Sequence, residues 1–155
     1  MTSFSTQVAE QVIERAEDGL NPELHPAVVP TPIDENDPIY QLAWKAAEAA
    51  DDRKGGDIVI IRVGEVSSLA EYFVMVTGYS KVQVRAIANA VDEKIQEDLG
   101  REPLRMAGMT EGLWSCIDYG DVVVHVQLPD QRDFYGLEAF WGHAPRIPFI
   151  PSVSE

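Results

Sequence analysis

The side chains best suited to chemistry gather in one short stretch of the chain, LWSCIDYGDVVVHVQ from Leu113 to Gln127. It holds a thiol, an imidazole and two carboxylates, those of Cys116, His125, Asp118 and Asp121. Three kinds of site could use them: a Mg²⁺ ion held by carboxylates, a Zn²⁺ ion held by mixed ligands, or a cysteine nucleophile with a histidine base. The elements that position these side chains decide among the three.

Two runs rich in β-branched and aromatic residues flank Tyr119-Gly120, which predicts an antiparallel hairpin closed by a tight turn. With these two residues in the loop, one face carries three predicted cross-strand pairs: Asp118 with Asp121, Cys116 with Val123, and Trp114 with His125. The opposite face is more apolar and is expected to pack on helices; it carries Ser115, Ile117, Val122, Val124 and Val126. Buried polar groups need partners, so we interpret the face with the indole, imidazole and carboxylates as a surface that a partner covers.

Residue spacing disfavours each catalytic or metal site. Two carboxylates that bind Mg²⁺ from one strand should be two residues apart, whereas Asp118 and Asp121 flank a turn. The segment Thr77-Gly78-Tyr79-Ser80 opens a predicted helix and could hold phosphate, so a nucleotide-binding or nucleotidyltransferase enzyme is the alternative hypothesis. No Cys-x-x-Cys or His-x-x-x-His spacing supports zinc, Cys116 is more simply a small buried hydrophobe, and His125 a packed, hydrogen-bonded strand histidine. We therefore predict no catalytic residue, no metal and no cofactor.

Composition indicates a globular protein with a protein partner. The chain has 155 residues, 45% of them hydrophobic, enough for one domain with a core. No segment is apolar enough to cross a bilayer and no basic start precedes an apolar block, so we expect a cytosolic protein. The single cysteine excludes an internal disulfide. The net charge of −14 argues against phosphate-driven binding of nucleic acid and favours a basic protein partner.

The acidic charge is concentrated at the N-terminus. Residues 1–37 hold eight acidic residues against Arg15 alone, together with four prolines. This composition predicts an acidic, extended tail, solvated or acting as a docking arm, with a transient helix from Thr6 to Glu17. We place one folded domain at residues 38–144 and an irregular C-terminal tail at 145–155.

Hydrophobic periodicity predicts the element order α, β, β, α, β, β, β, α. The expected elements are a helix from Asp37-Pro38 to Lys54-Gly55, strands Asp57–Val63 and Glu71–Val76, a helix from Ser80 to about Leu99, a short strand Leu104–Ala107, the hairpin, and a helix from Gln131 to about Trp141. Such an order is typical of an α/β (α+β) fold, a single mixed sheet of about five strands covered by helices.

Four blocks of sequence resemble the ribosomal silencing factor family, also called the Iojap family. The blocks are Asp57–Val63, Ala70–Ala88, Glu111–Val126 and Arg132–Ala144, and the resemblance covers residues 38–144. This chain departs from the family pattern at three places: Glu71 replaces a usual aspartate, Met106-Ala107-Gly108 replaces a segment that usually contains Glu-Gly, and Gln127 replaces a common aromatic residue.

The resemblance implies a nucleotidyltransferase-like fold without the active site, and therefore no enzymatic activity. Family members bind the fourteenth universal ribosomal protein of the large subunit, block joining of the small subunit and repress translation under nutrient limitation. They are often homodimers when free. For this chain the resemblance implies the same partner. The charge and composition given above predict no direct nucleic-acid specificity and no membrane contact.

Carried onto this sequence, the resemblance assigns partner-binding roles to residues of three blocks. From the hairpin they are Trp114, Asp118, Tyr119, Asp121 and His125; from the second block Tyr72, Ser80 and Arg85; from the last Tyr135, Glu138 and Trp141. We expect Asp118 and Asp121 to repel each other in the free protein, and a Lys or Arg of the partner to relieve that repulsion.

Overall fold

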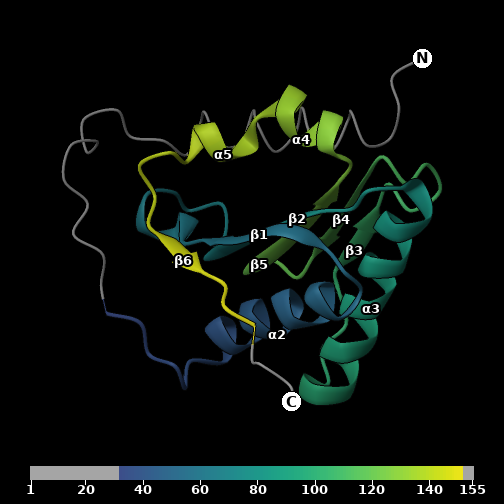
Figure 1. Cartoon of the computed structure of the whole chain (residues 1–155). Helices are drawn as coiled ribbons and strands as arrows, with labels where there is room; N and C mark the ends of the chain where they lie inside the picture. The colour runs from purple at the N-terminus through teal and green to yellow at the C-terminus, as the bar shows by residue number, and fades with distance from the viewer. Residues whose placement is uncertain (1–31, 152–155) are drawn as a thin grey trace.

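The computed structural model describes residues 32–151, which form one sheet with helices on both faces (Figure 1). The predicted transient helix at Thr6–Glu17, and most of the predicted acidic tail, lie outside the described residues. The elements in chain order are α2 (Pro38–Asp52), β1 (Gly56–Ile61), the 3₁₀ helix η2 (Val63–Glu65), β2 (Tyr72–Thr77), α3 (Lys81–Leu99), β3 (Arg105–Ala107), β4 (Trp114–Asp118), β5 (Val122–Gln127), α4 (Pro129–Tyr135), α5 (Leu137–Phe140) and β6 (Arg146–Pro148).

The sheet is mixed and has six strands in the order β3-β4-β5-β2-β1-β6. β2 and β5 run parallel, and the other neighbouring strands are antiparallel. This confirms the predicted fold class, although the segment after Ala144 was expected to be irregular. It adds the sixth strand instead, with Ile147 paired to Ile60. Pro148 is tolerated there because an edge strand can lack one amide donor.

Each face of the sheet has its own hydrophobic core. α2 and α3 cover one face, where Ile117, Val122, Val124 and Val126 pack as predicted. α4 and α5 cover the other face, which carries Phe73, Met75, Trp114, Cys116 and Val123. Within residues 32–151, no helix is long and apolar enough to span a bilayer.

Both long helices begin where their capping residues predict, and α3 also ends as predicted, whereas α2 ends at Asp52, two residues before Lys54-Gly55. The Asp37 carboxylate accepts a hydrogen bond from the amide of Ile39 at 3.0 Å, with Pro38 in the first helical position. The Ser80 hydroxyl accepts from the amide of Gln83 at 3.1 Å, and Gly100 ends α3 with φ 65°.

The predicted helix from Gln131 to Trp141 is wrong in one respect: it is two helices. Gly136 separates α4 from α5 and adopts a left-handed backbone with φ 53°. A helix cannot continue through that conformation, so the chain turns at Gly136 and α5 takes a new direction.

The predicted hairpin register is shifted by two residues. The amide of Tyr119 donates to the carbonyl of Val122 at 2.9 Å, so Gly120 and Asp121 form the loop, with Gly120 at φ 88°. The observed pairs are Asp118 with Val123, Cys116 with His125, and Trp114 with Gln127. Because side chains alternate with a period of two, the shift leaves every residue on its predicted face.

Candidate docking site

The hairpin face predicted to meet a partner is sealed by this chain's own helices. Trp114 is 1% exposed, and His125 and Trp141 are fully buried. Tyr135 of α4 packs over Trp114, with ring centroids 5.1 Å apart, and Trp141, which ends α5, packs edge-on to Phe73 at 4.7 Å. The expectation of an open aromatic face is therefore wrong, because α4 and α5 follow β5 and fold back over it.

The polar groups under these helices cannot act as a nucleophile and its base. Trp114 Nε1 donates a hydrogen bond to His125 Nδ1 at 3.1 Å, which places the proton of the neutral imidazole on Nε2. Burial lowers the pKa of His125 to about 3, so the ring stays neutral. Burial, and then the nearby Asp118 carboxylate, raise the pKa of Cys116 to about 12. The thiol stays protonated and inaccessible, as expected for a small core residue.

Two predicted contact residues are buried on the other face of the sheet. Tyr72 is 5% and Tyr119 2% exposed, and both belong to the core beneath α2 and α3. The Arg101 guanidinium lies 5.9 Å from the centre of the Tyr119 ring. Burial raises the pKa of Tyr119 above its ordinary value. Five of the predicted contacts, Tyr72, Trp114, Tyr119, His125 and Trp141, are thus core residues and leave the contact set.

The two hairpin carboxylates already have basic partners within the chain. Arg101 Nη1 donates to both oxygens of Asp121, at 3.0 and 3.2 Å, and Arg105 Nε lies 3.6 Å from Asp118. The Asp118 carboxylate also accepts from the amide of Gly120 at 2.8 Å. The expected mutual repulsion is therefore neutralised in the free protein, and no partner arginine is required to relieve it.

The two elements that suggested a nucleotidyltransferase lie at opposite ends of β2. The amides of Glu71 and Tyr72, at the start of β2, donate to the carbonyl of Asp121, which places the hairpin turn at that end of the strand. Thr77-Gly78-Tyr79-Ser80 follows the other end of β2, about 20 Å away for a strand of six residues. A phosphate at Ser80 and a metal ion at Asp118 and Asp121 could not serve one reaction. Within residues 32–151, no three His, Cys, Asp or Glu side chains are arranged to hold a metal ion.

The outer face of α4, which we define as Asp130, Asp133 and Phe134, combines an aromatic ring with two carboxylates. These residues lie three and four positions apart and so share one side of the helix, and all three are exposed. Phe134 is 80% exposed, and its ring meets that of Tyr135 edge-on at 5.0 Å. Tyr135, a predicted contact, is half-buried over Trp114, so a column of three rings runs from the core to the surface. The sequence analysis did not single out Phe134, because the side that a short helix exposes depends on how the helix packs on the sheet.

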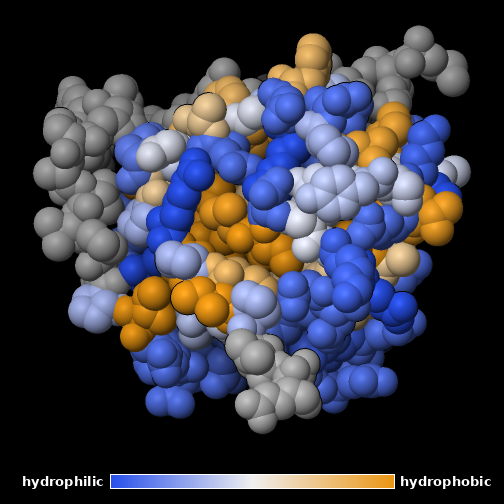
Figure 2. Space-filling model, viewed as in Figure 1, coloured by the Kyte–Doolittle hydropathy of each residue, from blue (hydrophilic) through white to orange (hydrophobic). Residues whose placement is uncertain are grey.

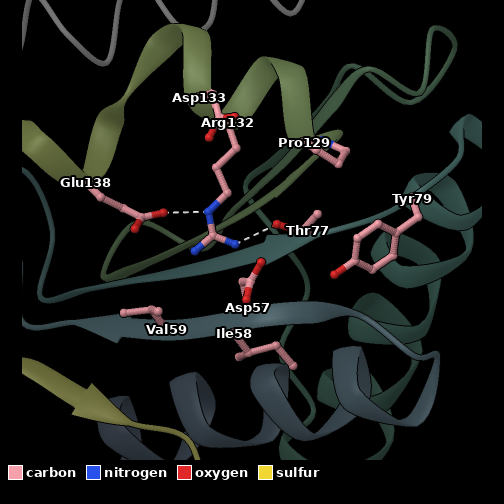
Figure 3. Close-up of a pocket in the computed structure, with 9 residues that line it drawn as sticks. All are labelled: Asp57, Ile58, Val59, Thr77, Tyr79, Pro129, Arg132, Asp133 and Glu138. Atoms are coloured by element: carbon pink, nitrogen blue, oxygen red, sulfur yellow. Dashed lines mark hydrogen bonds and ion pairs between the residues drawn. The ribbon is translucent and has the colours of Figure 1, made fainter.

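A pocket of about 610 Å³ lies beside α4, between α4–α5 and the strands β1 and β2 (Figure 3). Arg132 reaches from α4 into this space, pairs with Glu138 and donates to Thr77 Oγ1 at 2.7 Å. Glu138 also lies 3.8 Å from Arg146. Hydrophobic side chains lie open in the middle of Figure 2. Ile58 and Val59 of β1 line the pocket (Figure 3). The ion pairs hold α4 and α5 onto the sheet, which gives the predicted contact Glu138 a structural role.

The last two predicted contacts, Ser80 and Arg85, lie at the start of α3. Ser80 is exposed and serves as the helix cap, and Arg85 donates to the carbonyl of Thr110 at 3.4 Å. Tyr79 and Val82 beside them are 59% and 70% exposed. Val82 could have been recognised from the sequence, because it lies outside the buried stripe of Val84, Ile87, Ala88, Val91 and Ile95.

Comparison with known proteins gives a consistent result. The family model described as "Ribosomal silencing factor during starvation" matches residues 36–155. Ribosomal silencing factor RsfS of Chromobacterium violaceum is 41% identical over 104 residues, which are 67% of this chain and 84% of that protein. The protein of the same name from Bacillus subtilis is 41% identical over 100 residues, 64% of this chain and 84% of that protein. A crystal structure of a Chromobacterium violaceum protein has 38% identity and a TM-score of 0.65, covering 75% of this chain and 93% of that one.

Proposed function

The chain belongs to the ribosomal silencing factor family, and from this we propose that it represses translation by occupying the large ribosomal subunit in the cytoplasm. Its partner is the fourteenth universal ribosomal protein, on the face where the small subunit docks, and the bound protein blocks subunit joining sterically. The observation that carries the proposal is the family match over residues 36–155, which includes every described helix and strand. The protein acts by binding and catalyses no reaction. The free protein is a homodimer, and a measurement of its molecular mass in solution by light scattering tests this.

We assign the ribosomal protein to the outer face of α4. Exposed aromatic side chains that a partner can enclose are the usual anchors of protein interfaces, and Phe134 is the most exposed large hydrophobic residue among residues 32–151. Asp130 and Asp133 flank it and suit a basic ribosomal protein. Tyr135 supports Phe134 from below, so the anchor is held in position before binding.

Replacing Phe134 by alanine is expected to weaken binding to purified large subunits by about 30-fold, the effect of losing one interface anchor. Stability should change by less than about 0.5 kcal/mol, because the ring is exposed in the free protein. Co-sedimentation at several protein concentrations, alongside thermal unfolding, measures both quantities.

Leu104→Ala is the matched control for Phe134→Ala. Leu104 is 75% exposed and precedes the edge strand β3, next to the hairpin turn. It should bind large subunits as the unsubstituted protein does. Equal binding by both variants would remove α4 as the docking surface, whereas no binding by the unsubstituted protein would contradict the proposed function itself.

A further inference from the structure

The pocket beside α4 is acidic, because three carboxylates and one guanidinium line it. The carboxylates belong to Asp57, Asp133 and Glu138, and the guanidinium belongs to Arg132. Glu138 and Arg132 pair with each other. The exposed residues Asp57 and Asp133 form no ion pair with any residue among residues 32–151. Two negative charges at the pocket are therefore not neutralised within the part of the chain that the structure describes.

A bulge in β1 turns the Asp57 side chain toward the pocket. The register of β1 against β2 shifts after Gly56, whose partner is Thr77, because β1 has one residue more than β2 there. Without the extra residue, Asp57 would lie beside Val76 and face the core under α2 and α3, as Val76 does. The bulge places Asp57 on the side of the sheet that α4 covers, with φ 46°. The carboxylate is thus directed into the pocket by the backbone.

An aromatic ring forms one wall of the pocket. Tyr79 is 59% exposed, and its hydroxyl end points toward Asp57 in Figure 3. The hydroxyl oxygen packs on Gly56, where an added Cβ would come within 1.9 Å of it. The Tyr79 amide donates to Gln83 Oε1 at 2.8 Å. The ring is therefore held beside an unpaired carboxylate, while much of its surface stays open to solvent.

We infer that this pocket receives an arginine side chain of the ribosomal protein that α4 contacts. A guanidinium supplies the positive charge that the two unpaired carboxylates require, and its five N–H donors can reach acceptors on several sides of a cavity. It is also flat and stacks on aromatic rings, so a lining of carboxylates and a tyrosine fits arginine better than the compact ammonium of lysine. The volume of about 610 Å³ is that of a small-ligand site, so one side chain can enter it.

This inference rests on the proposed function and extends its docking surface. Asp133 belongs both to the outer face of α4 and to the lining of the pocket, so a partner that encloses Phe134 lies next to the pocket. A basic ribosomal protein can supply the arginine. The contact would fix the orientation of the bound protein, because a charge that enters a pocket is paired in only one register.

The test uses Asp57→Asn in the full chain, because Asp57 lies on β1 and is not part of the outer face of α4. Asparagine tolerates a left-handed backbone, so this substitution removes the charge and keeps the φ of 46°. Glu97→Gln is the matched control. It removes one exposed carboxylate from the last turn of α3, which covers the opposite face of the sheet (Figure 1). Both variants should keep the thermal unfolding midpoint of the unsubstituted protein.

Asp57→Asn should bind the isolated fourteenth universal ribosomal protein about 5- to 10-fold more weakly, whereas Glu97→Gln should bind it normally. Each arginine of the ribosomal protein is then replaced by glutamine in turn. One replacement should weaken binding to the unsubstituted protein by a similar factor and cause no further loss with Asp57→Asn. Such non-additivity is expected of two residues that form one pair.

Unchanged binding by Asp57→Asn, or the absence of any coupled arginine, would overturn the pocket contact and leave the proposed function intact. In that case spermidine binding that Asp57→Asn abolishes would assign the pocket to a free polycation. A lower light-scattering mass of Asp57→Asn would assign it to a second copy of this chain. Failure of the unsubstituted protein to bind either the isolated ribosomal protein or large subunits would instead refute the proposed function.

Discussion

Trp114→Ala is expected to lower the free energy of unfolding by about 3–5 kcal/mol, as truncation of a large buried aromatic side chain does. The indole is 1% exposed and is enclosed by Tyr135 and His125, so its removal leaves a cavity between the sheet and α4. The variant also loses the donor that His125 Nδ1 accepts from, and a buried polar atom without its partner adds to the cost. Urea denaturation at neutral pH, with the m-value checked for two-state behaviour, measures the loss.

Two further variants separate the packing and hydrogen-bonding parts of this effect. Trp114→Phe keeps a ring in the site but has no N–H, so it should lose less than the alanine variant. Trp44→Ala removes the same side chain from a half-buried position on α2, where it stacks on Tyr40, and should cost clearly less. A Trp114→Ala variant of near-normal stability that no longer bound large subunits would restore the partner-binding role expected from the sequence.

Local signals were sufficient to predict most of the helices and strands. Asp37 and Ser80 cap α2 and α3 through bonds to amides two and three residues away, and Gly100 ends α3 by its own backbone conformation. Such bonds depend on neighbouring residues alone, so the sequence pattern predicts them. The strand faces were also predictable, because alternation survives the two-residue shift of the hairpin register.

Which elements pack on each strand face depends on contacts between residues that are far apart in the sequence. No local pattern encodes such contacts. Asp121 meets Arg101 across 20 residues of sequence, and Arg132 meets Thr77 across 55. The three residues of β6 are too few to show periodicity and include a proline, so their pairing with β1 could not be predicted. A polar and aromatic strand face was taken for an open surface, whereas the contacts of Tyr135 with Trp114 and of Trp141 with Phe73 show that α4 and α5 cover it.

The stability of the protein is expected to fall as the pH drops below about 6.5, through the burial of His125. Burial lowers the pKa of His125 from 6.5 to about 3, with desolvation as its cause. Between these two values the unfolded chain binds a proton that the folded chain cannot, so each unit of decreasing pH favours unfolding by up to about 1.4 kcal/mol. The free energy of unfolding is unaffected by this group above pH 6.5. By pH 5 the protein has lost about 2 kcal/mol of stability through it.

His125→Gln isolates this contribution, because a glutamine can still accept from Trp114 Nε1 but does not titrate. Urea denaturation at about pH 7.5 and about pH 5 should show the unsubstituted protein losing about 2 kcal/mol more than the variant, whatever their difference at the higher pH. His143→Gln also removes one imidazole, but that residue lies outside the strand face. This variant should still lose about 2 kcal/mol more stability than His125→Gln between the two pH values. Equal acid sensitivity of the unsubstituted protein and His125→Gln would mean that solvent reaches the imidazole. In that case α4 and α5 would not cover β4 and β5 in solution. The choice of the outer face of α4 as the docking surface depends on that covering.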